Sequence, residues 1–275
     1  MANITAKEVN DLRKRTGAGM MDCKKALVEA DGDMEAAVDI LRKKGQKVAA
    51  KRGDNDANEG LVIGKTTSDN TKGVLVALNC ETDFVAKNDN FKNFVESLVD
   101  LAIDSSAGSV ADLLALNYDD KLTVEEKITE QVGVIGEKLT LSKFEVVNAE
   151  GVIAYNHPGN QIATIVGLNK AGQDEVGREV AMQVAAMAPI AVKEDEVDQE
   201  TINRELEVGK ELAIQEGKPA DMAEKIAQGR LKKFFKESTL LHQAFIKDNK
   251  KTVAQHLQDT DPDLTVVSFR RVQLK

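Results

Sequence analysis

The chain has 275 residues, a net charge of −9, 42% hydrophobic residues, two Cys and no Trp. This length suits one large or two medium domains, and the apolar fraction excludes a disordered polyanion. Two cysteines cannot build a disulfide framework, and without a Cys cluster a structural zinc is excluded. Few aromatic residues and the negative charge argue against a dedicated nucleic-acid-binding protein. The N-terminus has no basic-then-apolar signal and no apolar run reaches ~18 residues, so we expect a cytoplasmic protein that does not contact membranes.

The charge is unevenly distributed along the chain. Residues 1–53 contain 12 basic and 8 acidic residues, a net +4, and the remaining 25 basic and 38 acidic residues carry −13. Such a change of sign often marks a boundary between modules. The polar, Gly-containing stretch 51–60 is typical of a linker. We therefore predict an N-terminal domain over 1–53, whose basic face leaves RNA binding open as an alternative function.

The N-terminal domain is predicted to contain three short helices. Thr5 and Glu8 have the spacing of a capping box, and Gly17 ends the first helix. The second helix spans 20–30, and Asp33 caps a third that ends at Gly45. The helical spacing assigns to the core Val9, Leu12, Met21, Ala26, Leu27, Ala37, Ile40 and Leu41.

A domain this small has a thin core, which is typical of an interaction module. The first loop between its helices ends in Met20-Met21. Two adjacent residues cannot both lie on one core-facing stripe, so we expect one methionine to be exposed as an adaptable contact. The alternative is that both pack against the core and the start of the helix.

The acidic part predicts a repeated α+β unit. In the first copy (56–149) strands over 61–65 and 74–79 flank a hairpin turn, helices follow over 90–103 and 124–135, and a strand covers 139–147. The second copy begins with strands over 152–155 and 162–168, continues with a helix over 175–188, and ends with a strand over 264–272. The fold class is therefore α+β: a duplicated core of two three-stranded antiparallel sheets with helices. The second copy is split into 150–190 and 238–275.

The segment 195–237, between the two parts of the second copy, predicts an antiparallel helical hairpin. Its helices cover 198–215 and 220–237 around a Gly-Lys-Pro turn. Their small and apolar residues follow the 4-3-4 spacing of a coiled-coil seam: Ile202, Leu206, Gly209 and Ala213 on the first helix, and Met222, Ile226, Gly229 and Lys233 on the second. The other positions are nearly all charged, so the hairpin should project into solvent. Whether it is a solvated arm or a partner-binding arm stays open.

Several kinds of active site are poorly supported. Gly64-Lys65-Thr66 resembles the end of a phosphate-binding loop, but the preceding glycine is missing and no helix follows. No glycine-rich dinucleotide motif opens a helix, and three dispersed histidines do not form a metal site. Cys80 and His157 follow or precede equivalent strands, which leaves a nucleophile–base pair open as a third function. We expect no cofactor, no bound metal and no covalent catalysis.

The segment 79–87, Asn-Cys-Glu-Thr-Asp-Phe-Val-Ala-Lys, has an unusual composition for the end of a strand. Thr82 or Asp83 can cap a short helical turn, and Asp89 or Asn90 can cap the long helix that follows. An aromatic residue just after a strand often packs back into the core, which is one interpretation of Phe84. The other is that a rigid loop presents a carboxylate and a phenyl ring to another protein.

Three stretches of the sequence resemble the translation elongation factor Ts family. They are Leu12–Leu27, with Thr-Gly-Ala-Gly-Met-Met-Asp-Cys-Lys-Lys at its centre, the segment 79–87, and the hairpin 151–159 with His157. The resemblance runs from Met1 to about Val272 and includes the helical hairpin.

The resemblance implies a guanine-nucleotide exchange factor that binds elongation factor Tu, displaces Mg²⁺ and promotes GDP release so that GTP can bind. It also implies that the N-terminal domain is ubiquitin-associated-like and that 195–237 is a coiled-coil insertion. By similarity, the residues that displace Mg²⁺ are Thr82, Asp83, Phe84 and Val85, and the partner contacts are Leu12, Arg13, Met20, Met21 and His157. Pro158 stands where other members can have Gly, and contacts from a further C-terminal helix of some members are expected to be absent.

Overall fold

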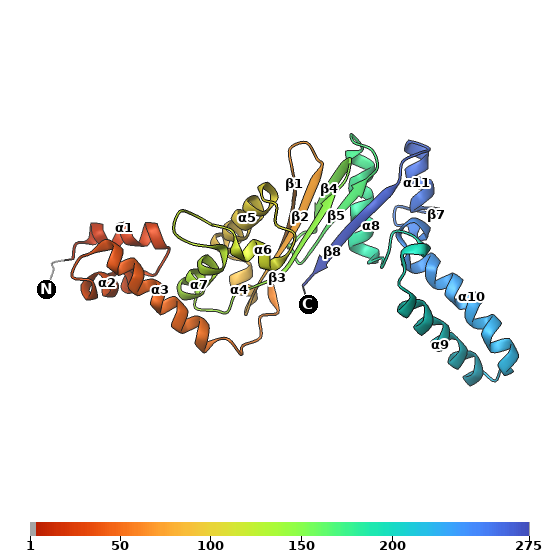
Figure 1. Cartoon of the computed structure of the whole chain (residues 1–275), viewed down its shortest axis with the longest axis horizontal. Coiled ribbons are helices and arrows are strands. Elements are labelled where there is room, and N and C mark those ends of the chain that lie inside the picture. Colours follow the sequence, from red (N-terminus) through yellow and green to blue (C-terminus); the bar gives the residue numbers. More distant parts are fainter. Residues whose placement is uncertain (1–3, 275) are drawn as a thin grey trace.

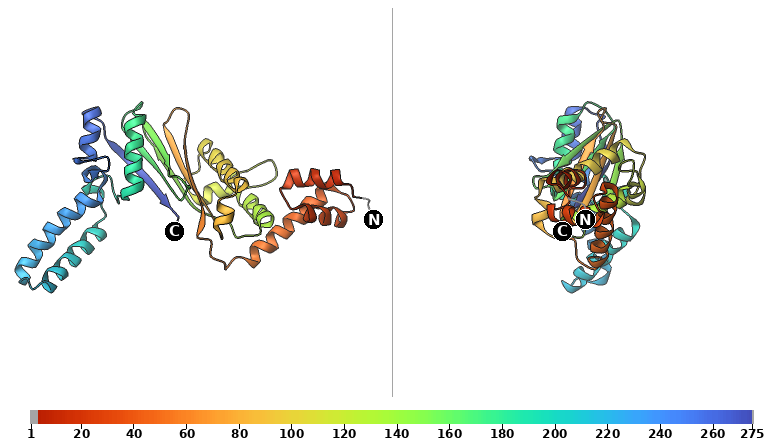
Figure 2. Two further views of the ribbon diagram at one scale, coloured as in Figure 1. Left: turned by 180° about the vertical axis from the view of Figure 1, so that it is seen from behind. Right: turned by 90° about the vertical axis from the view of Figure 1, so that its left-hand side faces the viewer.

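The computed structural model describes residues 4–274. Met1–Asn3 and Lys275, at the outer ends of the predicted segments 1–53 and 238–275, lie outside the described residues. The molecule is elongated, with a group of helices at its N-terminal end, two sheets in the middle and a projecting pair of helices beyond them (Figure 1). The reverse and end-on views in Figure 2 show that these parts follow one another along the long axis.

The three predicted N-terminal helices are present: α1 (Ala6–Thr16), α2 (Met20–Glu29) and α3 (Met34–Lys51). The amide of Glu8 donates to Thr5 Oγ1 (3.3 Å) and the amide of Thr5 donates to the Glu8 carboxylate (2.7 Å), so the capping box is confirmed. Gly17 ends α1 with a φ of 72°. Placing Met21 in the core was wrong, because its side chain is 62% exposed.

The prediction that α3 ends at Gly45 was also wrong. The helix continues to Lys51, and Gly45 is buried in its interior. It lies against Gly133 of α7 (Val124–Ile135), where a Cβ on Gly133 would come within 2.6 Å of the Gly45 Cα. Glycine is therefore needed here for the close approach of two helix backbones, which local sequence signals for a helix end do not distinguish.

The predicted strands are confirmed. Within residues 4–274 they form two antiparallel three-stranded sheets, β1-β2-β3 and β4-β5-β8, and the structure adds a short β6-β7 pair that was not predicted. Their bounds are β1 (Glu59–Thr66), β2 (Lys72–Cys80), β3 (Thr140–Asn148), β4 (Gly151–Asn156), β5 (Ile162–Leu168), β6 (Ala244–Phe245), β7 (Asp248–Thr252) and β8 (Val266–Gln273).

The two large sheets pack face to face, and helices cover both outer faces (Figure 1). Helices α5 (Asp89–Asp104) and α7 cover the first sheet, and α8 (Asp174–Met187) covers the second. Alternate residues of β1 and β2 point to opposite faces, as a strand requires. The layer between the sheets is made of Val62, Leu75, Ala77, Val147, Val152, Ala163, Ile165, Val272 and Leu274.

The two sheets are joined by matching hydrogen bonds. The Val62 amide donates to the Asn160 carbonyl (2.8 Å), and the Val152 amide donates to the Asn70 carbonyl (2.6 Å). Val62 and Val152 are 90 residues apart, and so are Asn70 and Asn160, so each pair occupies equivalent positions in the two copies. Asn70 and Asn160 also have nearly equal positive φ angles of 55° and 52°. The hairpin tip of each sheet thus rests on the first strand of the other, in the arrangement expected of a repeat.

Several short elements are absent from the sequence prediction: the helices α6 (Val110–Ala115) and α11 (Val253–Thr260), the β6-β7 pair, and the single 3₁₀ turns Glu194–Glu196 and Leu240–His242. These segments are too brief for hydrophobic periodicity to register. Two of them carry a local signal: Thr252 and Gln255 form a capping box at α11, and Ser109 caps α6 by accepting from the Asp112 amide.

The hairpin consists of α9 (Gln199–Gln215) and α10 (Ala220–Ser238). On α9 the predicted seam residues Gly209 and Ala213 are buried. On α10 the predicted seam was wrong by one position: Met222 is 51% exposed and nothing lies within 4 Å of a Cβ on Gly229. The buried residues there are Ala223 and Ala227, because small side chains let the α10 backbone approach Gly209. In the part of the chain that the structure describes, no helix is long and apolar enough to cross a membrane.

Candidate protein-binding site

The segment after β2 forms a short, well-anchored helix. Thr82 caps α4 (Asp83–Ala86), since its hydroxyl accepts from the Val85 amide (3.4 Å). Ala86 is buried and Val85 packs against the core of the first sheet. The cap of the following α5 is Asn88, which accepts from the Asn90 amide, rather than the predicted Asp89 or Asn90.

The Phe84 side chain is 82% exposed, more than any other large apolar side chain in residues 4–274. The interpretation that Phe84 packs into the core is therefore wrong. Burying a phenylalanine side chain stabilises a folded chain by about 1.5–3 kcal/mol, and this residue contributes almost none of that. An exposed ring on a rigid turn instead has its apolar surface available for a partner.

The Asp83 carboxylate precedes this ring in the chain and carries a negative charge. The Lys87 ammonium group donates to the Asp83 carboxylate over 2.6 Å, one turn along α4. This hydrogen bond holds the pKa of the Asp83 carboxyl below its ordinary value. The tip of the loop therefore presents an ionised carboxylate next to a phenyl ring.

Cys80 is not suited to act as a nucleophile. Its side chain is fully buried, and burial, with the nearby Glu137 charge, raises the pKa of the thiol to about 12. The thiol donates to the Thr82 carbonyl (3.2 Å). His157 is exposed, and its Nδ1 lies 3.1 Å from the Tyr155 hydroxyl. The structure thus gives no support to a Cys80–His157 catalytic pair.

The turn that carries His157 accommodates Pro158. The Asn160 amide donates to the His157 carbonyl (2.9 Å), and Gly159 has a φ of 89°. Proline followed by a glycine with positive φ fits a type II turn. Next to it, Gln161 donates to the Gly60 carbonyl (3.2 Å), and Gly60 pairs with Asn79 of β2. The structure therefore brings the His157 turn and the α4 loop to the same end of the two sheets.

The residues expected to bind a partner in the N-terminal helices have different exposures. Arg13 is exposed, and Met20 and Met21 are 60% and 62% exposed, so both methionines are available where only one was expected. Leu12 is fully buried among the three helices. A direct contact between Leu12 and a partner is therefore wrong for this structure. Val28 of α2, which sequence reasoning missed, is 49% exposed.

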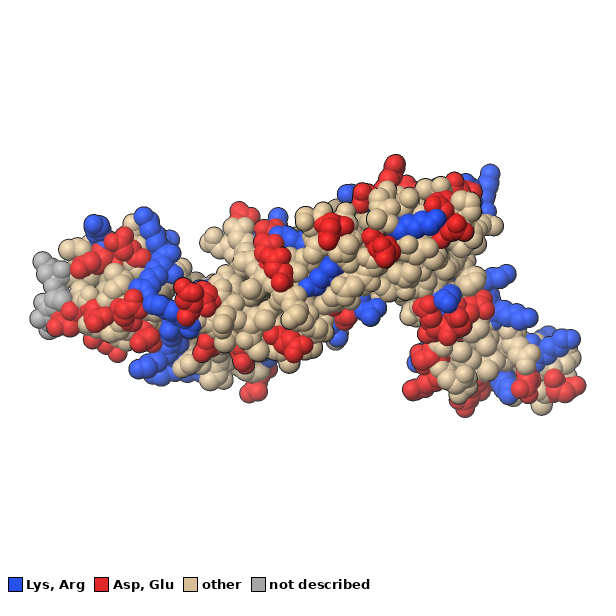
Figure 3. All heavy atoms as spheres, turned by 45° about the horizontal axis from the view of Figure 1, so that its top comes forward, with Lys and Arg blue, Asp and Glu red and all other residues tan. Residues whose placement is uncertain are grey.

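The charges on the surface follow the division seen in the sequence. Figure 3 shows a band of Lys and Arg side chains across the N-terminal helices, whereas both signs are scattered over a largely uncharged surface on the sheets. One hollow of about 400 Å³ beside these helices is lined by Lys25, Lys43, Lys44 and Lys47, with Asp22 and Glu29. The band suits a contact with a large surface.

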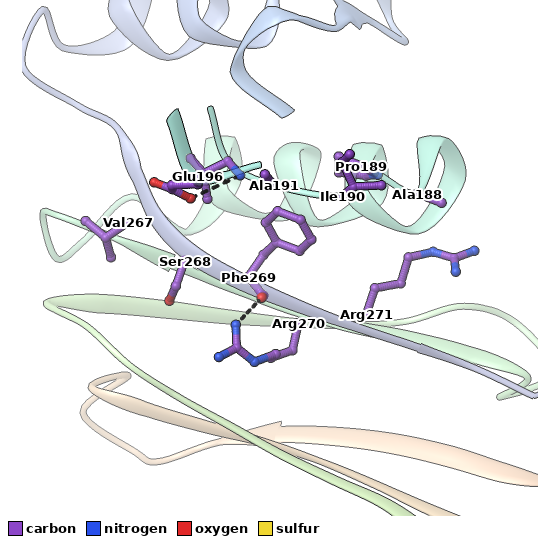
Figure 4. Close-up of a pocket in the computed structure, with 11 residues that line it drawn as sticks. Ala188, Pro189, Ile190, Ala191, Glu196, Val267, Ser268, Phe269, Arg270 and Arg271 are labelled. Atoms are coloured by element: carbon purple, nitrogen blue, oxygen red, sulfur yellow. Dashed lines mark hydrogen bonds between the residues drawn. The ribbon is translucent and has the colours of Figure 1, made fainter. Parts of the chain in front are cut away.

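A further hollow lies away from the α4 loop. It has a volume of about 450 Å³ and lies between β8 and the segment that follows α8. Figure 4 shows Phe269 at its centre, with Glu196 and Arg271 toward opposite ends. Arg270 points away from it and pairs with Glu145 of β3 (3.2 Å). In residues 4–274 there is no group of three or more His, Cys, Asp or Glu residues that could hold a metal ion.

Comparison with known proteins decides the family. Residues 81–275 match the family described as "Elongation factor TS". The chain is 53% identical over 276 residues to elongation factor Ts of Christiangramia forsetii, and the match covers 100% of both chains. The chain belongs to the elongation factor Ts family. Elongation factors Ts of Amoebophilus asiaticus and Porphyromonas gingivalis are 50% and 45% identical over 98% of each chain.

Membership in the elongation factor Ts family settles the general function. The chain is a nucleotide exchange factor that acts on elongation factor Tu in translation elongation.

Proposed function

We propose that the chain promotes GDP release by inserting the tip of α4, Asp83 and Phe84, beside the Mg²⁺ site of elongation factor Tu. The exposure of Phe84 on a helix whose Val85 and Ala86 pack inward carries this proposal. An exchange factor must bind the nucleotide-free GTPase more tightly than the GDP-bound form. By linkage it then weakens nucleotide binding by the same factor.

The loop Thr82–Val85 has the chemistry to disturb a metal site. Phe84 acts as a wedge between elements of the GTPase, while Asp83 and the backbone of the loop stabilise the shifted arrangement. Loss of Mg²⁺ leaves the phosphate charge uncompensated in a pocket of low dielectric constant, which costs several kcal/mol. GDP then leaves and GTP can bind. No covalent bond changes, so the chain is an exchange factor rather than an enzyme in the strict sense.

Further contacts come from both sides of the loop. We assign Arg13, Met20 and Met21 of the N-terminal helices to the partner surface, and His157 of the second sheet to the same interface. The exposure of all four supports this assignment. Methionine suits such a surface because its flexible side chain adapts to the partner. A wide interface supplies binding energy, while the wedge dominates the exchange step.

We also propose a division of the chain into domains. We assign 1–53 to a ubiquitin-associated-like domain, 56–149 to the first half of the core, and 150–190 with 238–275 to the second half. The insertion 195–237 is assigned to a coiled coil, which the packing of Gly209 against Ala227 supports. A cytoplasmic protein without a cofactor, and without direct contacts to membranes or nucleic acids, fits this role.

The test is release of fluorescent GDP from elongation factor Tu. We expect Phe84→Ala to slow the stimulated release at least about tenfold, or ~1.4 kcal/mol. Because the ring is exposed, its removal should change the free energy of unfolding by no more than about 0.5 kcal/mol. Met222→Ala, which truncates an exposed apolar side chain on the hairpin, is the matched control and should keep the wild-type rate.

Two results would contradict the proposal. One is full exchange activity in Phe84→Ala, and the other is failure of the wild-type chain to accelerate GDP release. A steep loss of activity with salt would favour the alternative of an RNA- or ribosome-binding scaffold, since binding to phosphates weakens strongly with ionic strength.

A further inference from the structure

A carboxylate distant in the sequence holds the backbone that leads into α4. Glu137 lies just after α7, at the loop before β3. Its Oε2 accepts from the amides of Glu81 (3.1 Å) and Thr82 (3.0 Å), and its Oε1 accepts from the Thr82 hydroxyl (2.6 Å). One side chain therefore fixes two consecutive peptide units and the capping hydroxyl.

The Glu81 side chain completes a reciprocal arrangement. It accepts from the Lys138 amide (2.5 Å) while its own amide donates to Glu137. It also accepts from Arg52 at the end of α3 (2.8 and 2.9 Å) and from Asn55 of the linker (2.9 Å). These bonds hold the pKa of the Glu81 carboxyl below its ordinary value, with the Lys138 amide as the largest cause. The segments 81–82 and 137–138 are thus joined by two carboxylates.

The α4 helix needs such support. A single turn of four residues cannot hold its own geometry, because helix nucleation is unfavourable. The exposed ring of Phe84 adds no packing that would fix it. The proton of the Thr82 hydroxyl is directed to Glu137, so an oxygen lone pair is left facing the Val85 amide. Glu137 therefore sets both the position of the cap and the direction in which it accepts.

We propose that Glu137 is a positioning residue for nucleotide exchange, which holds Asp83 and Phe84 in the geometry that enters the GTPase. This inference rests on the proposed function of the α4 tip. Fixing a binding element before contact lowers the cost of ordering it in the complex, so the loss of Glu137 weakens exchange without removing a contact. Glu137 itself need not touch the partner.

The test begins with Glu137→Gln. A glutamine has one acceptor oxygen in place of the two carboxylate oxygens. Its NH₂ group is a donor and would face the amides and hydroxyl of residues 81 and 82, which are donors as well. We expect stimulated GDP release to fall about tenfold. The matched control is Glu126→Gln in the same half of the core, because the Glu126 carboxylate also accepts from a backbone amide, that of Thr123 (2.9 Å), in the capping box of α7. This control should keep the exchange rate per folded molecule, because a glutamine oxygen can still accept from the Thr123 amide.

A double-mutant cycle separates positioning from general destabilisation. If Glu137 acts through the α4 tip, adding Glu137→Gln to Phe84→Ala should slow exchange by less than about twofold beyond Phe84→Ala alone. If Glu137 only stabilises the fold, the two losses multiply and the proposal is overturned. An exchange rate of Glu137→Gln equal to that of Glu126→Gln also overturns it.

A second pair of variants covers the case in which Glu137→Gln does not fold. Thr82→Val removes the hydroxyl that Glu137 binds, and Thr82→Ser keeps it. We expect stimulated GDP release to be slower in the valine variant than in the serine variant, and equal rates in the two would overturn the proposal. Wild-type rates in Phe84→Ala would instead refute the proposed function of the tip itself.

Discussion

The crossing of α3 and α7 offers a direct test of how the N-terminal helices are held on the core. A Cβ added at Gly133 would lie 2.6 Å from the Gly45 Cα and 3.1 Å from its nitrogen. Ordinary contacts begin near 3.4 Å, so Gly133→Ala forces the two backbones apart by about 1 Å. Overpacking of this kind costs about 1–3 kcal/mol.

The same substitution also favours helix formation, by about 0.8–1 kcal/mol. The net expectation for Gly133→Ala is a loss of about 0–2 kcal/mol in the free energy of unfolding. Gly229→Ala is the matched control, since it lies in the interior of α10 with nothing within 4 Å of its Cβ. It should gain about 0.5–1 kcal/mol, which makes the two variants differ by about 0.5–3 kcal/mol.

Urea unfolding measures the difference in stability, and GDP-release kinetics measure its consequence. Because Met20 and Met21 move with the N-terminal helices, Gly133→Ala should raise the KM for elongation factor Tu more than it lowers kcat. The reasoning is refuted if Gly133→Ala is as stable as Gly229→Ala and its KM is unchanged.

Two further predictions concern ionisable groups near the loop. Burial raises the pKa of the Cys80 thiol to about 12, so a thiol reagent at pH 8 should leave Cys80 unmodified in the native chain. Cys80→Ala should retain exchange activity. Rapid labelling of Cys80 or loss of exchange in the variant would contradict this prediction. The depressed pKa of Glu81 means that its contribution to stability is full above the ordinary Glu pKa of about 4.3 and is lost as the pH falls through the lower folded-state pKa. Wild type should therefore exceed Glu81→Gln in stability at pH 7 and lose that advantage in acid, and a gap in urea midpoints that is constant from pH 7 to pH 3 would disprove the assignment.

The sequence by itself determined most of the local structure. The capping box of Thr5 and Glu8, the apolar runs of β1 and β2, and the periodic apolar face of α5 each depend on neighbouring residues alone. The motif 79–87 likewise singled out Phe84, but left open whether the ring packs inward or points outward. A short segment contains no information about which surface lies behind it.

The tertiary structure decided the questions that depend on distant residues. Gly45 has the local appearance of a helix end, and only its contact with Gly133 shows why a glycine lies inside the helix. The orientation of α4 depends in the same way on Glu137, which is 55 residues beyond Thr82 and carries no local signal of that role. Leu12 fits the family motif of a partner contact, yet the packing of three helices buries it. Burial and hydrogen bonding between elements arise only when the chain has folded, so no pattern along it could fix them.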